Sequence, residues 1–147
     1  MLLIFWETGK DTGTEKVIEK SLLDALSKVN HYKLPTADYK KHIVKVIFTD
    51  SKKIRSLNKS YRKIDKETDV LSFAELDLDK KFTALKEEKN LGEIYINYDW
   101  IKKEKTPVEY ASKLFIHGYL HLLGYDHEKD HGEMEKLEKK LIRKIFP

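Results

Sequence analysis

The segment from Thr106 to Gly124 constrains the fold more than any other part of this chain. It starts with Thr-Pro-Val-Glu, which combines a capping box with proline at the first helical position. Gly124 is suited to the left-handed conformation in which many helices end. Between the two ends, apolar residues cover more than one face, as in a buried helix. We therefore expect a central helix around which the rest of the chain packs.

Four shorter segments are predicted to be β-strands, because they are short and mostly apolar. They are residues 1–6, 43–48, 69–73 and 91–96. The first two flank a helix, and this spacing predicts a crossover connection between two parallel strands. The last two are expected to be antiparallel neighbours, joined by a polar, lysine-rich loop that runs to about Asn90.

Three more helices are predicted from their ends and their apolar periodicity. The first has Thr14 as its N-cap and is followed by a connector over residues 31–41. The second is short and is capped by Asp50 or Ser51, and the last begins near Asp130. Their apolar positions recur at helical spacing: Val17, Ile18, Leu22, Ala25, Leu26 and Val29 in the first, Ile54 and Leu57 in the second, and Met134, Leu137, Leu141 and Ile145 in the last.

A chain of 147 residues, of which 40% are hydrophobic, fits one domain with one core. No internal repeat and no glycine- and serine-rich linker divides it. We expect an α+β fold, with a single compact domain over residues 1–147 that contains a small mixed four-stranded sheet packed with helices. The order of the strands stays open at this point.

The chain contains no cysteine, so disulfides and thiolate metal sites are excluded. Any metal must be bound by His, Asp, Glu or water. The apolar residues 1–6 lack the basic flank and cleavage site of a signal peptide, and no apolar run approaches the roughly 20 residues of a membrane helix. We therefore expect a soluble, cytoplasmic protein without a membrane partner. Its net charge of +4 is compatible with a polyanionic partner.

Three histidines at the end of the central helix form the most informative motif. His117 and His121 are four residues apart, so both rings lie on one helical face and can reach one ion. Gly124 then ends the helix and turns the chain, which allows His127 to return as a third ligand. Half of the six histidines lie in this short window. Three imidazoles leave one tetrahedral position open, which is typical of a catalytic zinc site.

Two other interpretations of this motif compete with a metal site of this kind. Single histidines on apolar helices are usually core residues, but three with a helix-ending glycine between the second and third are rare. Metzincin proteases share the spacing, but a glutamate that acts as general base follows their first histidine. Here that position is Gly118, which cannot move a proton. Met134 fits better as a core residue than as a metzincin-like methionine.

Residues 117–127 resemble the hallmark of the YbeY family of bacterial endoribonucleases, His-Gly-x-Leu-His-Leu-x-Gly-Tyr-Asp-His, at every fixed position. Residues 57–65 followed by 68–73 resemble the family's second motif, and residues 91–94 resemble a Leu-Gly-Asp-Ile segment. The order and spacing agree, so the resemblance covers most of the chain. The departures are Glu93 in place of the usual aspartate, and Ala74 and Glu75 where a proline is common.

This resemblance implies a compact α+β fold with one bound metal ion, usually taken as zinc (Zn2+). It also implies cleavage of single-stranded RNA, with work in maturing the 3′ end of small-subunit ribosomal RNA and in ribosome quality control. The implied partners are therefore single-stranded RNA, ribosomal RNA and the small ribosomal subunit, and no DNA partner is expected. The family's functionally important arginine corresponds to Arg62.

Arg62 lies in a strongly basic stretch. From Lys52 to Lys66 seven residues are basic and only Asp65 is acidic. A guanidinium beside a metal can bind two phosphoryl oxygens and stabilise the charge that develops in phosphodiester hydrolysis. The rest of the stretch is either a solvated face or, with Tyr61, a surface that follows an RNA backbone and stacks on bases.

Several roles stay open. Asp126 orients a histidine, activates water, or is only a solvated residue at the helix end. His131 is an extra ligand or a surface residue. No residue stands out as general base. The favoured hypothesis is a zinc-dependent endoribonuclease whose ligands are His117, His121 and His127. The alternatives are another three-histidine zinc hydrolase, such as a peptidase, and a non-catalytic ribosome-associated factor that binds RNA.

Overall fold

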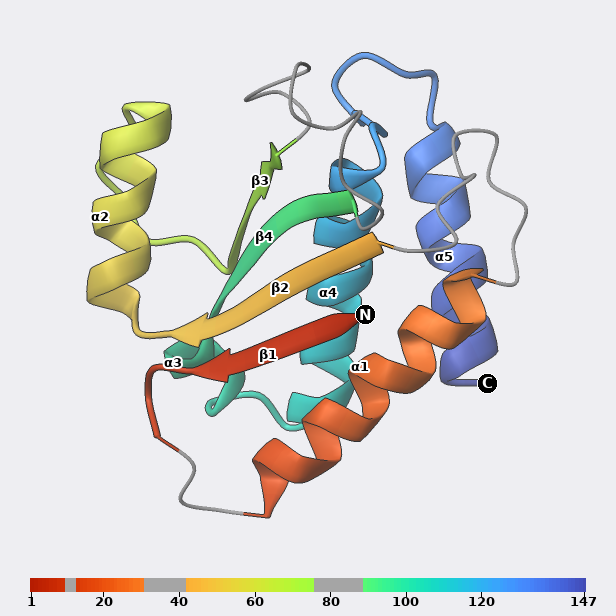
Figure 1. The fold of residues 1–147 in the computed structure, drawn as a ribbon, viewed down its shortest axis with the longest axis horizontal. Helices are drawn as coiled ribbons and strands as arrows, with labels where there is room; N and C mark the ends of the chain where they lie inside the picture. The colour runs from red at the N-terminus through yellow and green to blue at the C-terminus, as the bar shows by residue number, and fades with distance from the viewer. Residues whose placement is uncertain (10–12, 31–41, 76–88) are drawn as a thin grey trace.

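The computed structural model describes residues 1–9, 13–30, 42–75 and 89–147. The predicted connector over residues 31–41 and most of the predicted loop before Asn90 lie outside this described part. Along the chain the elements are β1 (Leu2–Trp6), α1 (Thr14–Asn30), β2 (His42–Thr49), α2 (Ser51–Arg62), β3 (Val70–Ala74), β4 (Lys89–Asn97), α3 (Tyr98–Ile101), α4 (Pro107–Leu122) and α5 (Glu133–Ile145), as Figure 1 shows.

The four strands form one mixed sheet in the order β1-β2-β4-β3. β1 and β2 are parallel, as the crossover through α1 predicted, and β4 also runs parallel to β2. β3 is antiparallel to β4, again as predicted, and lies at one edge of the sheet. The predicted α+β class with a mixed four-stranded sheet is therefore confirmed, and the open strand order is resolved with β4 between β2 and β3.

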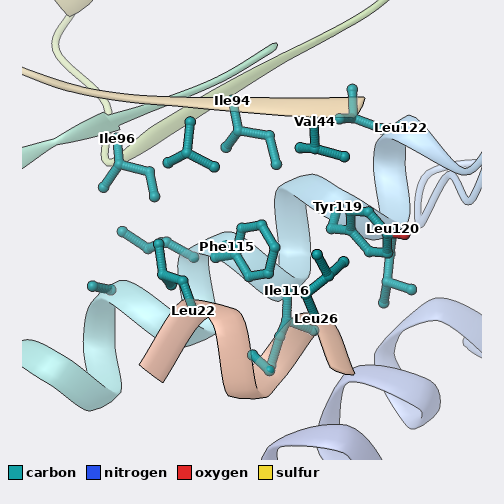
Figure 2. Packing of buried hydrophobic residues seen from close by; sticks show 14 of the residues in the cluster. Leu22, Leu26, Val44, Ile94, Ile96, Phe115, Ile116, Tyr119, Leu120 and Leu122 are labelled. Carbon is teal, nitrogen blue, oxygen red and sulfur yellow. The ribbon is translucent and has the colours of Figure 1, made fainter. Parts of the chain in front are cut away.

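Helices α1, α4 and α5 share one hydrophobic core with the sheet. Figure 2 shows Ile94 and Ile96 of β4 facing Phe115 of α4, with Leu22 of α1 on the other side of that ring. α2 lies apart from these three helices, against β3 and β4 (Figure 1). Within the described ranges, none of the helices has the length and apolar character needed to cross a membrane.

α4 is buried on more than one face, as its sequence predicted. Gly118 lies so close to β4 that a Cβ atom added there would be 2.8 Å from Cγ2 of Ile94. The close contact therefore requires glycine, and it holds the histidine-bearing end of α4 against the sheet. The buried residues of the helix are Ala111, Ser112, Leu114, Phe115, Ile116, Gly118, Tyr119, Leu120 and Leu122.

Two details of the predicted helices are wrong. Thr106 precedes α4, but its side chain makes no capping hydrogen bond, because its backbone (φ −123°, ψ 71°) is outside the extended conformation of N-cap residues. Val17 is predicted on the apolar face of α1, but its side chain is 53% exposed. The buried stripe of α1 begins instead at Ile18 and continues through Leu22 and Ala25.

Aspartates set the starts of α2 and α5. Asp50 is the N-cap of α2, and its side chain accepts a hydrogen bond of 2.8 Å from the backbone N–H group three residues on, which selects it over Ser51. α5 begins at Glu133, later than the start predicted near Asp130. The carboxylate of Asp130 instead accepts a hydrogen bond of 2.9 Å from the backbone N–H of Met134, inside the first turn.

Candidate metal centre

The three histidines of the motif come together at the C-terminal end of α4. His117 and His121 occupy the last two turns of the helix, and His127 lies in the loop that follows. The Nε2 atoms of His117 and His121 are 3.1 Å apart, and one ring nitrogen from each of the three residues lies within 4.8 Å of the others. The structure thus confirms the predicted convergence of these side chains.

The turn after α4 explains how His127 reaches the helix. Gly124 adopts φ +100°, the left-handed conformation that its position predicted. Its N–H donates to the carbonyl of His121 at 3.0 Å, and the N–H of Tyr125 donates to the carbonyl of Leu120 at 3.0 Å. This pair of hydrogen bonds is a Schellman motif, which reverses the chain at the helix end.

The Nδ1 atoms of two histidines are held by fixed oxygen acceptors. Nδ1 of His117 lies 2.9 Å from Oε1 of Glu138 on α5, and Nδ1 of His121 lies 2.9 Å from the backbone carbonyl of Tyr125. When each Nδ1–H donates to its oxygen, the lone pair of each Nε2 faces the shared point between the rings. Acceptors of this kind fix the tautomer and the orientation of histidines that bind metals.

Glu138 lies outside the histidine motif and was not predicted as a site residue. This residue follows Met134 by four residues and precedes Leu141 by three, so it falls on the apolar stripe of α5. Its side chain is only 19% exposed. A carboxylate on an apolar helix face usually has a specific partner. This pattern could have marked Glu138 as a candidate site residue. The role of the Tyr125 carbonyl has no side-chain signal in the sequence.

The donor set fits a metal ion. Two imidazole nitrogens bound at 2.0–2.1 Å in a tetrahedral zinc site lie about 3.3 Å apart. The observed separation of 3.1 Å between Nε2 of His117 and Nε2 of His121 is close to this value. Three imidazoles suit zinc and are also accepted by nickel, copper and iron.

Glu138 and burial move the pKa values of these histidines in opposite directions. The hydrogen bond to Glu138 raises the pKa of His117 above its ordinary value, against a smaller opposing effect of burial. Burial lowers the pKa of His121, and the neighbouring His117 lowers it further. A neutral His121 is the form that a metal ion needs.

Arg62 lines the same pocket as two of the three histidines, His121 and His127. The pocket has a volume of about 450 Å³, and Arg62 and Ser72 line it together with His121, Asp126 and His127. Arg62 is the last residue of α2, and its Nη2 atom donates a hydrogen bond of 3.3 Å to the carbonyl of Ser72 in β3. The structure therefore brings together a guanidinium and the histidines from distant parts of the chain.

Two residues whose roles were open are now placed. The carboxylate of Asp126 accepts a hydrogen bond of 2.9 Å from the backbone N–H of Glu128, and it faces the pocket. His131 is exposed, lies before α5 and is outside the group of three histidines. The oxygens that meet the Nδ1 atoms of His117 and His121 come from Glu138 and Tyr125 rather than from Asp126.

The structure gives a physical reason for the missing glutamate of the metzincin motif. Gly118 faces the sheet, where a Cβ atom would lie 2.8 Å from the side chain of Ile94. A glutamate at this position would require the side chain of Ile94 to move. The arrangement therefore keeps the metzincin spacing of histidines, while the position of the metzincin base packs against the sheet.

Comparisons with known proteins identify the family of this chain. A family model described as Endoribonuclease YbeY matches residues 7–146. Endoribonuclease YbeY of Helicobacter hepaticus is 37% identical, with 95% of this chain and 88% of the relative covered. Endoribonuclease YbeY of a Nitratiruptor species is 43% identical, with 67% of each chain covered.

The fold also matches a solved structure. The solution structure of TM1509 from Thermotoga maritima superposes with a TM-score of 0.58 at 28% identity, and the match covers 99% of this chain and 89% of that one. The resemblance inferred from the histidine motif is thereby confirmed by the match of a family model to nearly the whole chain. This chain belongs to the YbeY family.

Proposed function

We propose that this chain is a zinc-dependent endoribonuclease that cleaves single-stranded RNA, with His117, His121 and His127 as the ligands of one zinc ion. The observation that carries the proposal is a pocket lined by Arg62 and by two of the three converging histidines, in a member of an endoribonuclease family. On this view residues 1–147 form one metal-dependent hydrolase domain.

The histidines and the charged residues of the pocket have parts in the proposed reaction. A zinc ion bound there lowers the pKa of water toward 7 and polarises a phosphoryl oxygen. Arg62 binds the scissile phosphate and stabilises the negative charge that develops on its oxygens. Asp126 and Glu128 are the acidic side chains of the pocket, so they are the carboxylates available to accept the proton of the attacking hydroxyl.

We further propose that the natural substrate is ribosomal RNA, cut near the 3′ end of the small-subunit molecule in maturation and quality control on the small ribosomal subunit. The support is the family membership, together with an α2 surface rich in lysine and arginine. Such a surface favours contact with a phosphate backbone. The proposed location is the cytoplasm, where ribosomes are assembled.

The test is cleavage of end-labelled single-stranded RNA by the purified protein. Parallel samples contain protein treated with a chelator, chelated protein with zinc restored, and the His121→Ala variant. We expect cleavage by the untreated and the zinc-restored protein alone. Equal cleavage in all samples would assign the activity to a contaminating nuclease. No cleavage by folded, zinc-loaded protein would overturn an autonomous nuclease and favour a ribosome-dependent or purely RNA-binding role.

A further inference from the structure

Tyr61 is the most exposed of the large hydrophobic side chains among the described residues, at 69%. It lies in the last turn of α2, directly before Arg62. A fully hydrated tyrosine on a helix surface needs no explanation by itself. Tyr61 differs from an ordinary surface tyrosine because it lies next to Arg62 and because its ring packs against another aromatic ring.

The Tyr61 ring rests on a line of aromatic rings. Its centroid is 5.2 Å from that of Phe73 in β3, and the Phe73 centroid is 5.9 Å from that of Tyr95 in β4. The Tyr95 hydroxyl donates a hydrogen bond of 3.0 Å to Glu93, which fixes the far end of the line. One side of the Tyr61 ring is thus supported by protein while most of its surface stays open to solvent.

The aromatic line is attached to the metal pocket through β3. Ser72 accepts the hydrogen bond from Arg62, and the next residue, Phe73, supports Tyr61. Ser72 lines the pocket, whereas Phe73 points to the opposite face of the sheet, because side chains alternate along a strand. β3 is an edge strand, so a bound chain that passes over this edge can contact Arg62 and Tyr61 together.

Charge around this edge favours a polyanion over an apolar partner. Lys59 in α2 and Lys63, which directly follows the helix, flank Tyr61 in the sequence, and both residues are exposed. Asp65 forms ion pairs with both Arg55, at 2.8 Å, and Lys59, at 3.9 Å. Because it is the one acidic residue among seven basic residues from Lys52 to Lys66, this stretch keeps a net positive charge for a ligand. A ligand with a flat apolar ring and a negative backbone matches both features, and an unpaired nucleotide has this chemistry.

We propose that Tyr61, supported by Phe73 and Tyr95, is a stacking platform for an unpaired base of the RNA, next to the nucleotide whose phosphate contacts Arg62. This inference rests on the proposed function, since it takes single-stranded RNA as the substrate. It adds a base-binding subsite on the opposite side of β3 from the histidines. It also explains a preference for single strands, because a base stacked between its neighbours inside a duplex has no free face to offer.

The test measures binding and cleavage separately. Binding of a fluorescein-labelled single-stranded RNA is followed by anisotropy with chelated protein, so that no cleavage occurs. Loss of one stacked base weakens RNA binding by about 5- to 100-fold in comparable proteins. We expect a loss in this range for Tyr61→Ala, a change below about twofold for Tyr61→Phe, and a raised KM with little change in kcat for the zinc-loaded Tyr61→Ala enzyme.

A matched control and a modified RNA sharpen the test. Phe5 is 48% exposed on β1, the opposite edge strand, so Phe5→Ala removes an exposed ring away from the pocket and should bind RNA normally. RNA with a single abasic residue at the stacked position should bind the wild type as weakly as intact RNA binds Tyr61→Ala.

The outcomes separate this inference from the proposed function. Cleavage that does not depend on Tyr61, or equal losses for the Phe and Ala variants, would overturn the platform and leave the nuclease. Tyr61-dependent binding without cleavage would support the platform and overturn the nuclease. Absence of RNA binding by the folded wild type would overturn both.

Discussion

The two sides of the pocket are built differently. On the histidine side, His117 and His121 are anchored through hydrogen bonds of 2.9 Å to Glu138 and to the Tyr125 carbonyl, at the end of a buried helix. On the arginine side, Arg62 is exposed and bonds at 3.3 Å to one backbone carbonyl. The difference indicates that His117 and His121, two of the proposed metal ligands, are oriented before any ion or substrate binds, while Arg62 can adjust to a phosphate.

This contrast has a functional logic. A metal site needs donors that are already oriented, because reorganising them on binding would weaken the affinity. An arginine that stabilises negative charge on a phosphate during the reaction benefits instead from a side chain that can move. Changes on the histidine side should therefore alter metal retention, and changes on the arginine side should alter turnover with the metal retained.

Among changes outside the three histidines, the largest expected effect comes from Arg62. Arg62→Ala should lower kcat for RNA cleavage by about 100- to 1000-fold, the usual cost of removing a group that stabilises transition-state charge. Arg62→Lys should recover only part of the loss, because lysine cannot make the bidentate contact. Steady-state cleavage kinetics, with zinc content measured in parallel, check this. Loss of zinc from Arg62→Ala would contradict the division between the two sides.

The next effect comes from Glu138. Glu138→Gln should weaken zinc binding by about 10- to 100-fold, because the neutral amide holds and polarises His117 less well than a carboxylate. Competition with a chromophoric chelator measures the affinity. Glu135→Gln is the matched control, since Glu135 is on the same helix and bonds to the exposed Lys139. Equal zinc affinity in the wild type and Glu138→Gln would remove the assigned role of Glu138.

The smallest effect concerns pH. Protonated imidazole cannot bind zinc, so affinity falls as the pH falls through the pKa of a ligand. Because the hydrogen bond to Glu138 raises the pKa of His117, proton competition at this residue begins at a higher pH than for an ordinary histidine. Zinc titrations at a series of pH values on both sides of the ordinary histidine pKa should place the loss of affinity at lower pH in Glu138→Gln than in the wild type. If zinc affinity depended on pH in the same way in both proteins, the His117–Glu138 pair would not control the competition between protons and zinc.

The two sides also differ in how well the sequence predicted them. The spacing of His117, His121 and Gly124 is local, so the geometry of a helix and its end was enough to predict that the rings converge. Glu138 lies 21 residues from His117 along the chain, and the packing of α5 against α4 brings them together. A contact between two helices that are distant in sequence cannot be predicted from a short motif. The role of Arg62 rested on the family resemblance rather than on spacing.

In the fold as well, most features that depend on local sequence were predicted, and features that depend on contacts between distant residues were not. The strands, the parallel pair and the antiparallel pair followed from periodicity and connection length. The position of β4 between β2 and β3 depended on contacts across the sheet that no local pattern encodes. The prediction of a capping box at Thr106 was wrong because the residue types fit the motif but the backbone of Thr106 adopts another conformation. The line of rings from Tyr61 to Tyr95 joins three elements and was likewise invisible in sequence.

The most direct test of the central claim is a zinc titration of the chelated protein, with bound zinc and the initial rate of RNA cleavage measured in the same samples. The rate should rise in proportion to bound zinc and level off at one ion per chain, and His121→Ala should show neither. A full rate in metal-free protein, or saturation of the three-histidine site without any rise in rate, would contradict the account.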